Sequence, residues 1–281
     1  MSTSPQSFKV YSFAQHTEVY HILERVFASH GISYYLIGAN ARDIALYKAG
    51  ENPGKATADI DFAVMVPDHA SFVALKTQLI KEGFEGAGGT MPHRLHHSKS
   101  KTIIDLLPYG QIAQKYTVSF MDRKVELSTI GFNEVGTATE VFESPGGISI
   151  PVSPAHGLVI LKLIAFSEKP ERTKDLTDIA ALLKAAWPLY EPELFATDSA
   201  HADLFNVDDF DMATAAARLM GRKMRLALLP NKDLLLKIAL FLETDYTENN
   251  GPLSLAITKA LDSNLENSHA ILKALHKGLI E

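Results

Sequence analysis

Residues 55–64 read K-A-T-A-D-I-D-F-A-V, and this stretch decides how the chain is expected to fold. Acids alternate with apolar residues, which is typical of a β-strand because successive side chains of a strand point to opposite faces. Ile60 and Phe62 then face a core, while Asp59 and Asp61 stand side by side on the other face. Adjacent carboxylates repel each other and lose hydration when they are covered. The pair therefore indicates either a divalent-cation site or a strand rim open to water.

The composition describes an ordinary globular chain of 281 residues, 46% of them hydrophobic and 21% charged. It has no cysteine, which excludes disulfides and thiolate metal sites. The N-terminus has no basic region followed by an apolar stretch, and no apolar run approaches the roughly 20 residues of a membrane span. A net charge of -6 argues against non-specific coating of nucleic acid. We expect a cytoplasmic protein with no membrane partner.

The periodicity predicts an α+β fold, in which a mixed sheet flanked by helices is followed by a helical C-terminal region. Strands are expected at 33–37, 58–66, 102–108, 118–120, 124–130 and 148–153, and Pro151 hints that the last lies at a sheet edge. Helices are expected at 15–29, 40–49, 67–82, 154–166, 174–186, 212–229, 232–243, 253–261 and 267–279. The segment 185–217, with seven acids and no Lys or Arg, reads as an acidic connector. The predicted regions are an α/β head at 1–153 and a helical part at 154–281.

Asp105 is the single charge in the apolar run I-I-D-L-L. A buried carboxylate costs several kcal/mol without a partner, so Asp105 should have one. On a neighbouring strand of the same sheet it would stand beside Asp59 and Asp61. Three carboxylates on adjacent strands suit Mg²⁺ or Mn²⁺, which prefer hard oxygen ligands. The alternative is a salt bridge to a core arginine.

Gly38 lies between a predicted strand and a predicted helix, where free N–H groups and the helix dipole favour an anion such as phosphate. A tight structural turn explains the same glycine. Arg42 is in the first turn of that helix, where a cation opposes the dipole, and this favours a phosphate nearby. Asp43 offers the simpler partner for Arg42.

Four further groups allow two interpretations each. Lys162, alone in V-I-L-K-L-I-A-F, either reaches the surface or points into a cavity that holds negative charge. Asp175 and Asp178 are neighbours on a helix, where acids in the first turn are also favourable structurally. The histidines of P-H-R-L-H-H suggest zinc, but their spacing favours a polar loop or strand face. The basic residues Arg218, Arg222, Lys223 and Arg225 either contact phosphates or form a solvated helix face.

Gly38, then D-I-D, then an aspartate in an apolar strand resembles the nucleotidyltransferase superfamily of DNA polymerase β. Over residues 15–186 the likeness is closer to the AbiEii/MenT nucleotidyltransferases, which include toxins of type IV toxin–antitoxin systems. The motifs that carry it are Y-L-I-G-A-N-A-R-D, T-A-D-I-D-F-A-V, I-D-L-L-P-Y-G, the G-F-N-E turn, L-K-L-I-A and T-K-D-L-T-D-I-A-A-L-L.

The resemblance implies roles for these positions. Asp59 and Asp61 become the metal-binding pair, and Asp105 the third carboxylate that also takes the proton of the attacking hydroxyl. Gly38, Ala39 and Asn40 become the phosphate turn, although Ala39 stands where the superfamily usually has Gly or Ser. Arg42 falls on a further family position and is implied to lie near the triphosphate. Lys162 and Asp175 fall on positions implied in nucleotide binding and activity. The likeness therefore implies that residues 154–186 complete the active site.

The expected function is Mg²⁺-dependent transfer of a nucleoside monophosphate from an NTP to a hydroxyl acceptor, with release of pyrophosphate. The resemblance favours the 3′ end of tRNA as acceptor and implies a possible cognate antitoxin. A protein side chain, modified as in AMPylation, is the alternative acceptor. A non-catalytic nucleotide-binding or partner-binding module is the alternative of another class.

Overall fold

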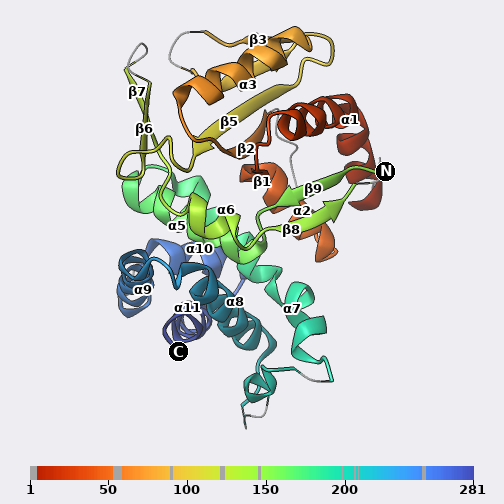
Figure 1. Ribbon diagram of the computed structural model, residues 1–281. Helices are drawn as coiled ribbons and strands as arrows, with labels where there is room; N and C mark the ends of the chain where they lie inside the picture. Colours follow the sequence, from red (N-terminus) through yellow and green to blue (C-terminus); the bar gives the residue numbers. More distant parts are fainter. Residues whose placement is uncertain are drawn as a thin grey trace. The chain divides into compact units, whose positions relative to one another are not determined.

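The computed structural model describes residues 5–52, 59–88, 91–120, 124–144, 147–197, 199–205, 207, 209–248 and 251–281, with side chains from residue 16 onward. The chain forms two compact units, which are described separately (Figure 1). One comprises Met1–Ile44 and Pro53–Ser153, and the other Ala45–Asn52 and Pro154–Glu281. Residues 55–58 of the opening stretch and the expected hairpin turn at 121–123 lie outside the described residues.

The first unit is built on a mixed seven-stranded sheet of strand order β3-β4-β5-β2-β1-β9-β8. Strand β2 is parallel to β5 and antiparallel to β1, and β1 is parallel to β9. A separate antiparallel pair is formed by β6 and β7. The strands are β1 (Tyr34–Ile37), β2 (Asp59–Met65), β3 (Phe84–Gly86), β4 (Arg94–His97), β5 (Ile103–Tyr109), β6 (Thr117–Phe120), β7 (Val125–Ser128), β8 (Glu140–Glu143) and β9 (Ser149–Val152).

Helices of the first unit cover the apolar residues of this sheet. The ring of Phe62, on β2, lies 6.1 Å from the rings of both Tyr20 and Phe27 of the first helix. The third helix begins where the sequence predicted, because the Asp68 carboxylate accepts a hydrogen bond from the backbone N–H of Ser71. The helices are α1 (Pro5–Ser29), α2 (Gly38–Lys48, whose last four residues belong to the second unit), α3 (His69–Lys81) and α4 (Phe132–Gly136).

The second unit is helical over its described residues. Helices α8 and α11 cross so closely that a Cβ atom on Gly221 would lie 2.1 Å from the carbonyl oxygen of Leu275. No helix in the described part of the chain has both the length and the apolarity to cross a membrane. The elements are α5 (Ala155–Glu168), α6 (Thr173–Lys184), α7 (Ala186–Leu194), a 3₁₀ turn (Ala202–Leu204), α8 (Met212–Leu228), α9 (Lys232–Thr247), α10 (Pro252–Leu261) and α11 (Leu265–Ile280).

The predicted fold class is confirmed: a mixed sheet is flanked by helices and followed by a helical C-terminal region. The expectation that Pro151 marks a sheet edge was wrong, because β9 lies between β1 and β8. The register of β1 with β9 is set at Leu36 and Val152, one residue past the proline. The missing N–H of Pro151 therefore interrupts little of this short ladder.

The acidic connector expected at 185–217 was also wrong in part, because it contains α7. The ring of Trp187 packs edge-on against Phe195 and Phe210, with centroids 5.9 and 6.0 Å away. Tyr190 and Leu194 are buried. Apolar packing thus forms a helix in a segment whose charge and prolines suggested none.

Candidate active site

The acids of β2 and β5 lie in one row across the sheet of the first unit. The strand register places Ile37 of β1 beside Asp61 of β2, and Asp61 beside Asp105 of β5. Asp59, two residues before Asp61, points to the same face of the sheet. One carboxylate oxygen from each of Asp59, Asp61 and Asp105 lies within 4.8 Å of the other two. We call these three residues the acid cluster.

The acid cluster fits a divalent cation by the chemistry of its donors. All its ligand atoms are carboxylate oxygens, which suit hard ions such as Mg²⁺ and Mn²⁺. Asp105 is buried, whereas the Asp59 side chain is 38% exposed, so one side of the cluster is open to a ligand. Among the described residues, no histidine belongs to a cluster of potential metal ligands.

Gly38 lies directly against the acid cluster. It follows the last residue of β1, opposite Asp61, and has a φ of +67°. A Cβ atom at this position would lie 2.0 Å from Oδ2 of Asp61. The amide of Asn40 donates a 2.8 Å hydrogen bond to the backbone carbonyl oxygen of Asp59 and so ties the start of α2 to β2. The predicted phosphate turn, including the half-buried Ala39, therefore lies beside the predicted metal ligands.

Arg42 has the structural partner that the sequence offered. Its Nε and Nη2 donate hydrogen bonds of 3.0 and 2.7 Å to Oδ1 of Asp43, and both residues are buried. This ion pair accounts for Arg42 in the first turn of α2. A contact with the triphosphate stays a prediction.

Arg94 is the residue of this site that the sequence did not reveal. Strand β4 sets it beside Asp105, where Nε and Nη2 donate to Oδ1 and Oδ2 at 2.8 and 2.7 Å. Its Nη2 also donates to Oδ2 of Asp59 at 3.0 Å. These hydrogen bonds, above all those to Asp105, raise the pKa of Arg94, which stays a cation. Asp105 thus belongs to the acid cluster and also pairs with an arginine, so both alternatives apply to it.

The signal for Arg94 was present in P-H-R-L-H-H, a stretch that draws attention to its histidines. The ring of His97 packs against Phe84 with centroids 4.9 Å apart, and its Nδ1 is 2.8 Å from the Ser100 hydroxyl. His93 has a lowered pKa because it is partly buried, an effect that Asp105 opposes. Only His96 shares the strand face of Arg94, because His97 is on the buried face of β4 and His93 lies before the strand.

Lys162 and Asp175 meet in the second unit. The Lys162 Nζ donates to Asp175 at 3.1 Å and to Asp178 at 2.6 Å, and all three side chains are buried between α5 and α6. The Nε of Arg172 donates to the other oxygen of Asp175 at 2.7 Å. The lysine therefore does not reach the surface, and the negative charge it faces comes from carboxylates of its own unit.

The basic segment of α8 is largely paired within the chain. Arg218 and Arg222 bind the Glu281 carboxylate with N–O distances of 2.6 and 2.5 Å, and both also contact Asp203. Lys223 pairs with Glu193 at 2.7 Å. These contacts favour a structural role for the cluster.

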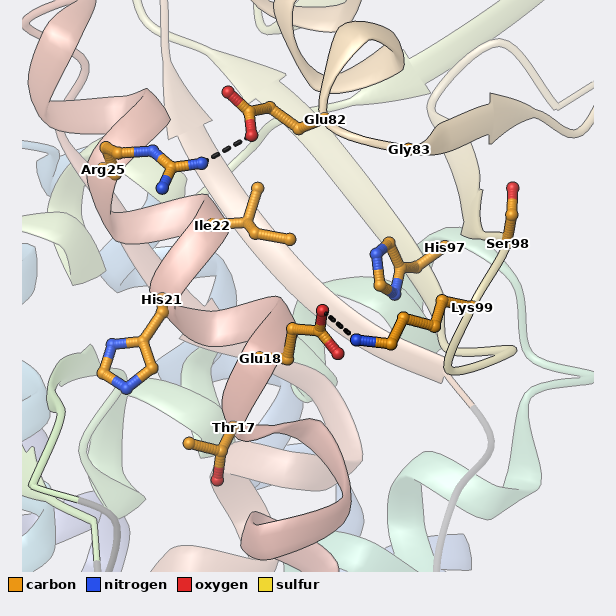
Figure 2. A pocket seen from close by; sticks show the side chains of 10 residues that line it. All are labelled: Thr17, Glu18, His21, Ile22, Arg25, Glu82, Gly83, His97, Ser98 and Lys99. Carbon is orange, nitrogen blue, oxygen red and sulfur yellow. Dashed lines mark hydrogen bonds and ion pairs between the residues drawn. The ribbon is translucent and has the colours of Figure 1, made fainter.

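A hollow of about 880 Å³ in the first unit lies between α1 and the ends of α3 and β4 (Figure 2). Its charged side chains pair across it, Glu18 with Lys99 at 2.7 Å and Arg25 with Glu82 at 2.5 Å. None of the predicted site residues lines it. We therefore place the candidate chemistry at the acid cluster and not in this hollow.

Three comparisons relate the chain to known proteins. No curated protein matches it. Among solved structures, that of the antibiotic-resistance factor ANT(2'')-Ia is 12% identical in sequence, with 63% of this chain and 88% of that chain covered and a TM-score of 0.38. The family described as "Nucleotidyl transferase AbiEii toxin, Type IV TA system" matches residues 22–265. With this match over most of its length, the chain belongs to the AbiEii nucleotidyl transferase toxin family.

Proposed function

We propose that this protein transfers a nucleoside monophosphate from an NTP to a hydroxyl acceptor, in a reaction that depends on Mg²⁺ or Mn²⁺. One observation carries the proposal: three carboxylates of adjacent strands have ligand atoms within 4.8 Å of one another in a chain of a nucleotidyl transferase family. A degenerate, non-catalytic copy would be expected to lose one of these acids.

In this reaction the acceptor oxygen forms a bond to the α-phosphorus, and the bond from that phosphorus to the α,β-bridging oxygen breaks. Pyrophosphate leaves with the electron pair, and the hydroxyl proton passes to a base. The bound cation supplies positive charge that stabilises the attacking and leaving oxygens. Asp59, Asp61 and Asp105 would hold that cation. Asp105, the buried member, is also the candidate base.

The turn at the start of α2 would bind the phosphates. The first N–H groups of α2 and the positive end of its dipole lie at this turn, and both favour an anion such as phosphate. Ala39 contributes only its backbone, and Asn40 holds the turn against β2. Arg42 would have to leave part of its pairing with Asp43 to contact a phosphate.

Lys162 and Asp175 belong to the buried ion-pair network between α5 and α6, within residues 154–186. Their proposed role in nucleotide binding rests on the family likeness. The division into a head at 1–153 and a helical region at 154–281 is part of the same proposal.

The favoured acceptor is the 3′ end of tRNA, with a protein side chain as the alternative. The description of the family as toxins of type IV systems supports a cognate antitoxin as partner. Because Arg218, Arg222 and Lys223 of α8 are paired within the chain, the acceptor proposal does not rest on this segment.

The test is incubation of the purified protein with each α-labelled NTP, Mg²⁺ and either total tRNA or a cell extract. We expect label in tRNA, pyrophosphate in equal amount, and a loss of at least about a hundredfold in Asp61→Asn and Asp105→Asn. Glu126→Gln, which removes an exposed carboxylate of β7, should leave the rate unchanged. Label in a protein band would instead identify a protein acceptor. Absence of pyrophosphate with every acceptor would exclude the enzyme.

A further inference from the structure

Arg94 contacts two of the three members of the acid cluster, Asp59 and Asp105. Its Nη2 lies 2.7 Å from Oδ2 of Asp105 and 3.0 Å from Oδ2 of Asp59. One nitrogen thus bridges carboxylates of two adjacent strands. Its Nε holds the second oxygen of Asp105 at 2.8 Å. The guanidinium is a planar fork that matches a carboxylate with two parallel hydrogen bonds, which makes this arrangement strong and specific.

A cation held by Asp59 and Asp105 would compete with this nitrogen for the same two carboxylates. Mg²⁺ binds oxygen at roughly 2.0–2.1 Å, so an ion between two carboxylates excludes a nitrogen held there by the same oxygens. The two positive charges would also repel each other at close range. Arg94 therefore cannot stay in its observed position when the bridging site fills.

Both oxygens of Asp105 accept charge-assisted hydrogen bonds from Arg94, which hold the guanidinium on this proposed metal ligand. The Arg94 side chain is 23% exposed and lies on β4, next to the edge strand β3 of the sheet. It has an open direction in which to move.

We propose that Arg94 is the resident counter-cation of the acid cluster, and that a divalent cation binds only as the guanidinium leaves the position between Asp59 and Asp105. This inference deepens the proposed function and rests on its metal site. Before the cation binds, Arg94 offsets the repulsion among the three acids of β2 and β5. After it leaves, the oxygens of Asp59 and Asp105 that it bound would hold the cation.

The test is direct titration of Mn²⁺ into the full-length protein, with free Mn²⁺ followed by electron paramagnetic resonance and no nucleotide present. We expect Arg94→Ala to bind Mn²⁺ on the order of tenfold more tightly than the parent, because the competing cation is gone. In chelator, the same variant should melt at a lower temperature than the parent. Saturating Mn²⁺ should narrow this difference.

Arg25→Ala is the matched control, because it removes one positive charge from the same unit at an exposed ion pair with Glu82. Its Mn²⁺ affinity should equal that of the parent. Arg94→Lys keeps the charge but loses the two-pronged contact, so its affinity should lie between those of the parent and Arg94→Ala. This variant decides the question if Arg94→Ala does not fold.

The outcomes separate this inference from the proposed function. If parent and Arg94 variants bind Mn²⁺ equally, or the variants bind more weakly, Arg94 does not compete with the cation and the inference fails while the metal site stands. If none of them binds Mn²⁺, the metal site and the inference fail together.

Discussion

At the scale of single residues, the acid cluster and Gly38 depend on each other. The Asp61 carboxylate occupies the space that a side chain at position 38 would fill, with Oδ2 only 2.0 Å from the Cβ position. The φ of +67° at Gly38 adds a second requirement for glycine, because other residues are strained in that region. The Asp61 carboxylate, a proposed metal ligand, can therefore take its observed orientation only because position 38 has no side chain.

We predict that Gly38→Ala displaces the Asp61 carboxylate and abolishes most Mn²⁺ binding and nucleotidyl transfer. The backbone strain alone should lower the free energy of unfolding by roughly 1–2 kcal/mol. Urea unfolding, Mn²⁺ titration and label transfer measure the three effects.

Gly31→Ala is the control for Gly38→Ala. Gly31 has a φ of +61°, but nothing lies within 4 Å of the Cβ position. It should lose a similar amount of stability and keep cation binding and activity. Equal losses of binding in both variants would show that backbone strain, and not the contact with Asp61, governs the site.

At the scale of elements, helices α9 and α10 are joined by a buried carboxylate. Asp245 of α9 accepts hydrogen bonds from the backbone N–H groups of Leu253 and Ser254, both at 2.8 Å, and from the Ser254 hydroxyl at 2.6 Å. These N–H groups belong to the first turn of α10, where the helix itself offers no acceptor. Asp245 therefore acts as the N-terminal cap of the following helix.

We predict that Asp245→Ala lowers the free energy of unfolding by about 3 kcal/mol or more, because buried donors lose their acceptor. Asp211→Ala is the matched comparison: Asp211 caps α8 through one hydrogen bond to the Thr214 N–H, at an exposed position. It should cost about 1 kcal/mol. Urea denaturation of the two variants measures both values. A similar cost for both would mean that burial adds nothing to the cap of α10.

Also at this scale, the sequence predicts those helices and strands that have a clear hydrophobic periodicity of their own. The alternation in β2 and the periodicity of α8 to α11 were sufficient. The helix α7 was missed because its stability comes from contacts of Trp187 with Phe195 and Phe210, which no local pattern announces. Strand β4 was missed for a related reason: its four residues pair with β3 and β5 on both sides, and three of the four are polar, among them Arg94, which contacts the acid cluster.

At the scale of the whole molecule, the sequence predicted the part of the site that lies on neighbouring strands of one sheet. The parallel register of β2 and β5 places Asp61 beside Asp105, as the sequence led us to expect. Arg94 could not be derived, because any of several cations could have been the partner of Asp105 until the strand order was known. The sequence thus shows which buried charges need an oppositely charged partner, and the strand order determines which residue is that partner.

The stability of the whole molecule depends on pH through His156, a buried residue of the second unit. Burial, with a smaller contribution from Lys223, lowers the pKa of His156 from 6.5 to about 3. The folded protein therefore holds this imidazole neutral, with Nδ1 3.4 Å from the Tyr190 hydroxyl. Between pH 6.5 and 3 the unfolded chain binds a proton here that the folded chain does not.

Stability from this group is thus complete above pH 6.5 and is lost as the pH falls toward 3. We predict that His156→Gln makes the free energy of unfolding less dependent on pH in this window, by up to about 1.4 kcal/mol per pH unit. Urea denaturation of both proteins at steps from pH 8 downward measures the difference. Above the window the difference should be constant, since the imidazole is neutral in both states. A difference that stays constant through the window as well would mean that His156 takes up its proton in the folded protein, and that its burial is looser than the packing around Tyr190 indicates.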